Sequence, residues 1–301
     1  MIEAPGEISR PALMAGIGCY LLWGVMPLLF MALARAGAGE WEILAQRAMW
    51  SAPWAGLVVL ISGHGEQARA VFARPKVLAL LACSTVAIFI GWAVFVWAIN
   101  SGRNLDASLG YYINPLMNMA VGALLFKERI DRWGAVAIGL AVTGVVLQTW
   151  ALGHLPGVSL VLAAAFLIYG LIRRHVTVGA QVGLWVECLL MAGPGLAYVV
   201  WLHHSGGGVF LRSGLGTALL FAVGPGTVVP LFLFSWSARR LPLSAVGFLQ
   251  FIAPTIQFFI GVNNGESLSL LRAASFGVIW AGVAVFAIGL WRAGRERGLV
   301  V

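Results

Sequence analysis

Apolar runs follow one another along almost the whole chain, separated by short breaks that carry charged or turn-forming residues. A helix needs roughly 20 apolar residues to cross the hydrocarbon core of a bilayer. The runs that approach or reach this length are 12–34, 43–62, 77–100, 106–126, 133–150, 157–172, 180–202, 214–236, 243–262 and 270–291. The sequence therefore predicts an all-α integral membrane protein with ten transmembrane helices and no separate soluble domain.

The composition also indicates that the chain lies in a lipid bilayer. The 301 residues are 60% hydrophobic and 10% charged, whereas a soluble domain carries roughly a quarter charged residues. Because such a small number of charges cannot cover the outside of a soluble fold, lipid must surround much of the chain. The net charge of +8 does not indicate nucleic-acid binding, because the basic residues form small groups between apolar runs and no single basic face or tail.

The basic residues also predict the orientation. Most of the 19 Lys and Arg residues fall in one set of alternate loops, which includes both ends of the chain. Cytoplasmic loops carry such an excess of Lys and Arg. We therefore expect ten spans with both termini in the cytoplasm, in a multi-pass protein of the cell's inner (plasma) membrane.

The residues that support metal, cofactor or enzyme chemistry are sparse and scattered. Cys19, Cys83 and Cys188 each lie in an apolar run without CxxC spacing or a nearby histidine, so neither a disulfide framework nor a zinc site is expected. The histidines lie in loops or at predicted helix ends, and nothing resembles a phosphate-binding loop. We expect no metal, no cofactor and no enzyme activity.

Two predicted helices look like copies of each other. The stretch SLGYYINPLMNMAVG (108–122) aligns with GFLQFIAPTIQFFIG (247–261) at a constant offset. The matched pairs are Ser108 with Gly247, Tyr111 with Gln250, Pro115 with Pro254, Asn118 with Gln257, and Gly122 with Gly261. Residues 1–150 and 151–301 are therefore predicted to be two five-helix repeats. Because five is odd, the second repeat enters the membrane from the opposite side, as in many secondary transporters.

Each of these two helices carries a polar stripe. Side chains at 100° per residue gather within about 120° of one another: Ser108, Tyr111, Asn114, Pro115 and Asn118 on the first helix, and Gln250, Pro254 and Gln257 on the second. Polar groups at membrane depth face other helices or a water-filled path. The stripes predict either a substrate cavity or interhelical hydrogen bonds with close helix approach. Pro115 and Pro254 are either gating bends or inert kinks.

Two charges and two tryptophans complete the candidate cavity residues. Glu187 lies well inside an apolar run and is a candidate for proton coupling or for contact with a substrate amine. Arg47 lies near the outer end of its run and either meets an anionic group or snorkels outward. Trp97 and Trp185 either line a cavity for apolar or aromatic groups or face lipid.

Six stretches resemble the RarD-type branch of the EamA family, in the drug/metabolite transporter (DMT) superfamily. They are WGVMP (23–27), EILAQRAMWS (42–51), WAINSGRNLDASLGYYINPLMN (97–118), YGLIRR (169–174), FLQFIAPTIQFFIGV (248–262) and FGVIW (276–280). The resemblance implies ten helices in two inverted halves around a central cavity that works by alternating access. It also implies export of amino acids, including aromatic ones, and some RarD members carry a label that links them to chloramphenicol.

Taken together, these features predict an exporter of small metabolites, with amino acids as the leading substrate class. A zwitterion with an apolar side chain suits a cavity with amide, hydroxyl and aromatic groups. Export of drugs or sugar-linked metabolites remains an alternative, and so does a membrane scaffold that transports nothing. The expected partners are a small-molecule substrate and the lipid bilayer.

Overall fold

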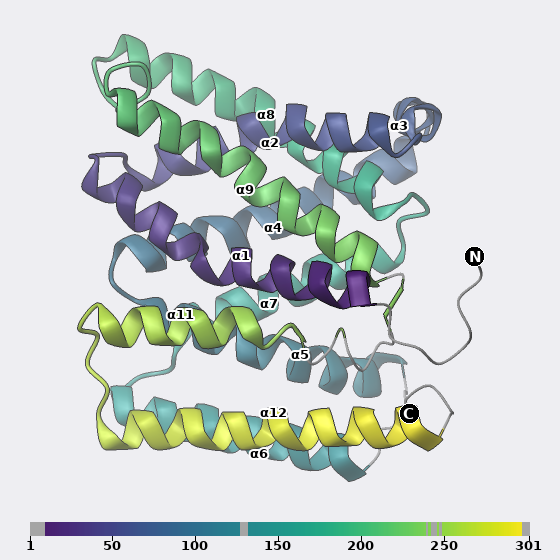
Figure 1. Cartoon of the computed structure of the whole chain (residues 1–301), viewed down its shortest axis with the longest axis vertical. Coiled ribbons are helices and arrows are strands. Elements are labelled where there is room, and N and C mark those ends of the chain that lie inside the picture. The colour runs from purple at the N-terminus through teal and green to yellow at the C-terminus, as the bar shows by residue number, and fades with distance from the viewer. Residues whose placement is uncertain (1–9, 127–131, 239, 242–245, 247–248, 297–301) are drawn as a thin grey trace. The chain divides into compact units, whose positions relative to one another are not determined.

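The fold is a set of helices that correspond closely to the apolar runs of the sequence. A computed structural model describes residues 10–126, 132–238, 240–241, 246 and 249–296 (Figure 1). The helices are α1 (Arg10–Arg35), α2 (Glu40–Ile61), α3 (Gly65–Phe72), α4 (Pro75–Asn100), α5 (Asn104–Phe126), α6 (Arg132–Leu152), α7 (Gly157–Arg174), α8 (Ala180–His204), α9 (Gly214–Ala238), α11 (Ile252–Asn263) and α12 (Leu270–Glu296). Across these described ranges no residue belongs to a strand, which confirms the all-α class.

Two features differ from the expected helices. The short helix α3 lies where only a loop is predicted, and it buries Ala68 and Val71. The ninth helix was expected over residues 243–262; residues 246 and 249 are helical, a turn follows at residues 250–251, and α11 begins at Ile252. Pro254 fits the first turn of α11, because its missing N–H has no helical partner there.

Among the described residues, seven helices are long and apolar enough to cross a membrane: α1, α4, α6, α7, α8, α9 and α12. Two further helices at predicted spans, α2 and α5, are not among these seven, and α11 has 12 residues. The chain is therefore a multi-pass membrane protein, and ten crossings remain a prediction.

The helices form two compact units that mix the two halves of the sequence. The first unit contains Met1–Gly24, Gly102–Ala164 and Trp236–Val301, and the second contains Val25–Ser101 and Ala165–Ser235. In the first unit α6 pairs with α12 and α5 with α11, and in the second α2 pairs with α8 (Figure 1). Each unit thus draws helices from residues 1–150 and from residues 151–301.

Glycines bring the paired helices close together. A Cβ atom added at Gly195 of α8 would lie 2.9 Å from the carbonyl oxygen of Ala45 in α2. One added at Gly144 of α6 would meet the side chain of Ile279 in α12. Small residues of this kind let membrane helices approach and gain van der Waals contact.

Candidate functional site

The two helices with matching polar stripes, α5 and α11, pack directly on each other in the first unit. The hydroxyl of Ser108 donates to the carbonyl oxygen of Pro254 at 2.8 Å. The hydroxyls of Tyr112 and Thr255 are hydrogen-bonded at 2.6 Å. Ser108 and Tyr112 are fully buried, so this part of the interface is closed by interhelical hydrogen bonds.

The remaining stripe residues differ in exposure. Tyr111 and Asn114 are half-buried, while Asn118 is exposed and its amide donates to the backbone and side chain of Asn114. Gln257 is 2% exposed and donates to the carbonyl oxygen of Trp23 at 3.3 Å. Gln250 lies half-buried in the turn before α11. Tyr111, Asn114 and Asn118 of α5 are therefore the accessible residues of the two stripes.

The two matched prolines occupy different helix positions. Pro115 lies in the middle of α5, whereas Pro254 lies in the first turn of α11. Pro115 removes an internal helix hydrogen bond, while the N–H that Pro254 lacks has no helical partner at that position. Gly247, which matches Ser108 in the repeat, lies outside the described residues.

In the second unit, Glu187 is the centre of a buried polar cluster. Its side chain is fully buried and accepts hydrogen bonds from Ser84 of α4 at 2.5 Å and from Tyr169 of α7 at 3.1 Å. Nη1 of Arg173, at the end of α7, lies 3.7 Å from its Oε1. Three helices thus converge on one carboxylate within an apolar helix bundle.

Arg47 points into the protein and does not snorkel outward. It is 7% exposed, and its Nε donates to the hydroxyl of Thr227 in α9 at 3.0 Å. Its guanidinium lies 3.9 Å from the ring centroid of Trp92 in α4, a cation–π contact. Arg47 therefore ties α2 to α4 and α9.

The two candidate tryptophans, Trp97 and Trp185, differ in exposure. Trp97 is 43% exposed on α4. Trp185 is half-buried, lies against Gly56 of α2 and forms an edge contact with Phe72 of α3. Neither side chain lines the three cavities described below.

A cavity of about 250 Å³ lies beside the Glu187 cluster, among α2, α7, α8 and α9. Tyr169 and Arg173, two partners of Glu187, line it together with Gln181 and Ser235. The rest of its wall is apolar: Ala55, Val58, Ala180, Leu184, Val228, Leu231, Phe232 and Phe234. Another cavity, of about 360 Å³ among α2, α4 and α8, is lined almost entirely by apolar groups.

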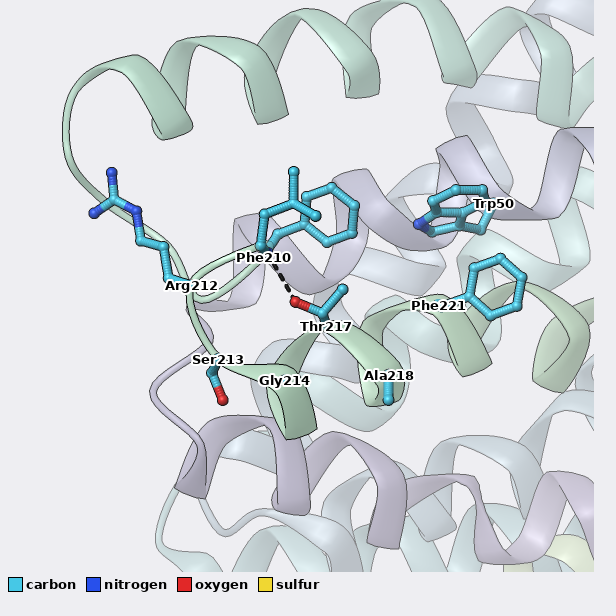
Figure 2. A pocket seen from close by; sticks show the side chains of 9 residues that line it. Trp50, Phe210, Arg212, Ser213, Gly214, Thr217, Ala218 and Phe221 are labelled. Atoms are coloured by element: carbon cyan, nitrogen blue, oxygen red, sulfur yellow. Dashed lines mark hydrogen bonds between the residues drawn. The ribbon is translucent and has the colours of Figure 1, made fainter.

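A third and wider pocket, of about 600 Å³, lies at the loop that joins α8 to α9 (Figure 2). Trp50 and Phe221 form one end, with their ring centroids 4.7 Å apart. Leu211 adopts a left-handed backbone conformation with φ of 61°, and its N–H donates to the Thr217 hydroxyl, the dashed line in Figure 2. The Arg212 side chain turns away from the pocket and donates to carbonyls at the end of α8.

A carboxylate accepts backbone N–H groups of another chain segment in each unit, and Glu42 is buried while Glu266 is half-buried. In the second unit, Oε1 of Glu42 accepts the backbone N–H groups of Val209 at 2.9 Å and Phe210 at 3.0 Å. In the first unit, Glu266 accepts the backbone N–H groups of Asn104 and Leu105 at the start of α5. These bonds fix the α8–α9 loop and the N-terminus of α5.

The sequence of the chain matches a known family. Residues 10–150 match the EamA-like transporter family. Protein RarD of Streptomyces exfoliatus is 37% identical over 96% of this chain and 91% of that protein. Protein RarD of Escherichia coli is 34% identical over 92% of this chain and 94% of that protein. The chain is a RarD-type member of the EamA family.

Other relatives extend the match to transporters. An uncharacterized transporter of Pseudomonas aeruginosa is 40% identical over 95% of this chain and 96% of that protein. A solved crystal structure of a protein shares the fold, with a TM-score of 0.60 and 19% identity over 95% of this chain. The EamA protein is therefore a DMT-type membrane transporter of the inner membrane, which confirms the resemblance carried by the sequence motifs.

Sequence reasoning on this EamA protein missed several residues of the polar clusters. Tyr169, Arg173 and Asp106 lie in stretches that resemble the family, but none of them was a candidate site residue. Asp106 is 3% exposed and pairs with Arg272. For Arg173 and Asp106 the available sequence signal is a charged residue at the end of an apolar run.

We expect that replacing Glu42 by alanine loosens the α8–α9 loop of the EamA protein. The change leaves the partly buried N–H groups of Val209 and Phe210 without their acceptor, which costs about 1–3 kcal/mol. Hydrogen exchange of residues 205–213 should become faster. Glu40→Ala is the control, because it removes a carboxylate from the same helical turn; equal exchange in both variants would contradict the role of Glu42.

Proposed function

We propose that this RarD-type protein is a secondary transporter that exports small metabolites, with amino acids as the leading substrate class. Its ten transmembrane helices form two inverted five-helix halves, residues 1–150 and 151–301, with both termini in the cytoplasm. The halves exchange conformations and so open a substrate site alternately to the two sides of the membrane. Membership in a transporter family supports the transport step.

The pairing of helices is the observation that carries this proposal. In the proposed repeat α2 corresponds to α8, α5 to α11 and α6 to α12. These same corresponding helices pack on each other inside the two units. Two halves related by a two-fold axis in the membrane plane bring corresponding helices together near that axis, so the pairing supports inverted repeats.

Tyr111, Asn114 and Asn118 are the stripe residues best placed to contact a substrate. They are at least partly accessible, whereas Ser108 and Gln257 are buried and bond to backbone carbonyls. Ser108 and Gln257 therefore fix the helices around the site, and Pro115 supplies the bend in α5. Trp97, Trp185, Gln250 and Arg47 have supporting roles in this proposal, and Glu187 is the candidate for proton coupling.

Two alternatives remain in view. One relative, from Pseudomonas aeruginosa, is named chloramphenicol-sensitive protein RarD and is 29% identical over 80% of this chain. This name favours testing drug export, together with sugar-linked metabolites, as the second candidate. A scaffold that transports nothing is the third.

Counterflow with purified protein in liposomes tests the proposal. Unlabelled amino acid inside the vesicles should drive uptake of the labelled amino acid, and a panel with and without aromatic side chains identifies the class. Chloramphenicol added inside tests the second candidate in the same vesicles. Folded and inserted protein that exchanges no amino acid would overturn the amino-acid proposal, and exchange of nothing at all would favour the scaffold.

We expect alanine at Tyr111, Asn118 or Gln257 to reduce the initial counterflow rate at least about tenfold, because each change removes a polar contact in a water-poor site. The amount of folded protein should stay the same for Tyr111→Ala and Asn118→Ala. The control is Thr143→Ala on α6, since the Thr143 hydroxyl donates only to Gly139 of its own helix. Full transport in all three variants would contradict this placement of the site.

A further inference from the structure

The 250 Å³ cavity of the second unit has the features of a small-molecule site. Its walls come from four helices and are mostly apolar, and its polar groups are confined to Tyr169, Arg173, Gln181 and Ser235. Ligand sites are commonly apolar clefts with a few polar groups that orient the ligand. The volume suits a molecule of about the size of an amino acid.

Arg173 has more hydrogen-bonding capacity than its neighbours use. A guanidinium carries five N–H donors. Nη2 donates to the carbonyl oxygen of Ala180 at 3.4 Å, which is long for a hydrogen bond. Nη1 is buried without a hydrogen-bond partner and lies 3.7 Å from Glu187. Because the protein encloses Nη1, an acceptor in the cavity reaches it only when Arg173 turns toward the cavity, and it would then satisfy a donor that has no hydrogen-bond partner.

Gly183 leaves room for the Arg173 guanidinium at this position. A Cβ atom at position 183 would overlap the Arg173 guanidinium, so only glycine lets Arg173 lie flat against α8. Because position 183 has no side chain, Arg173 lies at the edge of the cavity, where its planar guanidinium can meet a planar acceptor. A carboxylate matches that fork in shape and charge.

Glu187 does not depend on Arg173 for its hydrogen bonds. Ser84 and Tyr169 both donate to it, and it is fully buried behind the cavity wall. It therefore balances the charge of Arg173 in the apolar bundle when the cavity is empty. Arg173 can turn toward a ligand without leaving the Glu187 carboxylate unsatisfied.

We propose that this cavity binds the carboxylate of an amino acid with an apolar side chain, and that Arg173 is the residue that binds it. Gln181 and Ser235 supply oxygens for the substrate ammonium group, and the wall at Val58, Leu231 and Phe232 covers the side chain. Glu187 pairs with Arg173 when the cavity is empty and competes with the substrate carboxylate for it. This proposal rests on amino-acid transport and adds a carboxylate-binding site in the second unit, distinct from the α5 residues proposed above as substrate contacts.

The proposed topology gives the cavity a direction. Arg173 ends α7 beside Arg174, in one of the basic loops assigned to the cytoplasm. The cavity therefore lies toward the cytoplasmic side, where an exporter takes up its substrate.

Thermal unfolding of the full-length protein in detergent micelles, with phenylalanine and phenylalanine amide as probes, tests this site. Ligand that binds the native state raises the unfolding midpoint. Phenylalanine should stabilise the wild type more than its amide does. Arg173→Gln should weaken phenylalanine binding at least about tenfold and change amide binding less than about twofold, because only the acid uses the charged fork. Arg174→Gln, which neutralises the exposed neighbour, should behave as the wild type.

Two further variants keep the test decisive if Arg173→Gln does not fold. Leu231→Trp fills the cavity and leaves Arg173 and Glu187 in place, so it should abolish stabilisation by both probes. Glu187→Gln should tighten binding of phenylalanine and leave the amide unchanged, because Arg173 is no longer shared with a carboxylate. A purely structural role of Glu187 would shift both probes together.

The outcomes separate this site from the proposed function. Absence of phenylalanine stabilisation in the wild type, an acid-over-amide preference that survives Arg173→Gln, or binding that survives Leu231→Trp would each overturn the site. Counterflow of labelled phenylalanine decides the function independently. Exchange that is equal in the wild type and in Leu231→Trp would leave amino-acid transport standing with its site elsewhere, whereas no exchange of any amino acid in the wild type would remove the proposed function itself.

Discussion

Replacing Asp106 by asparagine is expected to lower the free energy of unfolding by about 3–5 kcal/mol, the usual cost of breaking a buried ion pair. Asp106 is 3% exposed, and its Oδ1 lies 2.9 Å from Nη2 of Arg272, which is itself 9% exposed. Its Oδ2 pairs with Arg103 at 2.8 Å. The isosteric amide keeps the shape of the side chain but leaves a buried guanidinium without its anion. Unfolding of the protein in mixed micelles by increasing detergent denaturant measures the change.

The partners of Asp106 supply the controls. Arg103→Gln should cost less than about 1 kcal/mol, because the Arg103 side chain is 35% exposed and solvent screens the pair. The double variant Asp106→Asn with Arg272→Gln should recover part of the lost stability, since no buried charge is then left alone. A double variant as unstable as the sum of the two single variants would show that the ion pair does not carry the effect.

Gly224→Ala is expected to have the second-largest effect, a loss of about 3 kcal/mol, at the upper end for overpacking of a closed core. A Cβ atom at position 224 of α9 would lie 2.6 Å from Cβ of Trp50 and 2.8 Å from the Trp50 carbonyl carbon and oxygen. Because the clash involves backbone of α2, no side-chain rotation relieves it. The unfolding midpoint should fall. The tryptophan fluorescence of the folded protein should change, because Trp50 lines the pocket at the α8–α9 loop and would move.

Gly193→Ala in α8 is the matched control, since a Cβ atom there meets nothing within 4 Å. It should be neutral or stabilising by up to about 1 kcal/mol, because alanine favours the helix over glycine. Equal destabilisation by both variants would mean that helix propensity or membrane insertion, and not the contact with Trp50, decides the result.

The positions of the long helices could be predicted because one physical requirement, about 20 apolar residues in sequence, determines them. The helix α3 could not be predicted from this requirement. It has eight residues, carries Glu66 and Arg69, and is held by burial of Ala68 and Val71 against its own unit. A short amphipathic helix gives no long apolar run, so hydropathy alone does not reveal it.

The start of α11 could not be predicted because the repeat alignment treats Pro115 and Pro254 as equivalent. In the structure one proline lies inside a helix and the other in a first turn. Hydropathy does not distinguish these positions, since the residues before Pro254 are as apolar as those after it. The local turn at Gln250 and Phe251 decides the difference.

The candidate site was predicted only in part, because a single sequence contains no information on which helices touch. Glu187 was singled out as a carboxylate inside an apolar run, but its hydrogen-bond partner Ser84 lies 103 residues away along the chain. The matched stripes predict that α5 and α11 are corresponding helices of a repeat, and they leave open whether their polar groups bond to each other or to a substrate. The structure shows the first for Ser108, while the role of Tyr111, Asn114 and Asn118 stays a prediction.

The pairing of α6 with α12 also constrains how the protein is made. When α1 to α6 have left the ribosome, the face of α6 at Gly144 that packs against Ile279 still lacks its partner. That face must stay in contact with lipid or with the insertion machinery until residues 270–296 are synthesised. Similarly, α2 lacks its packing partner until α8 is synthesised, because the backbone of Ala45 in α2 packs against Gly195 of α8. Residues 1–150 cannot complete either packed unit during their own synthesis, so the second unit assembles only after α8 is made and the first only after α12 is made.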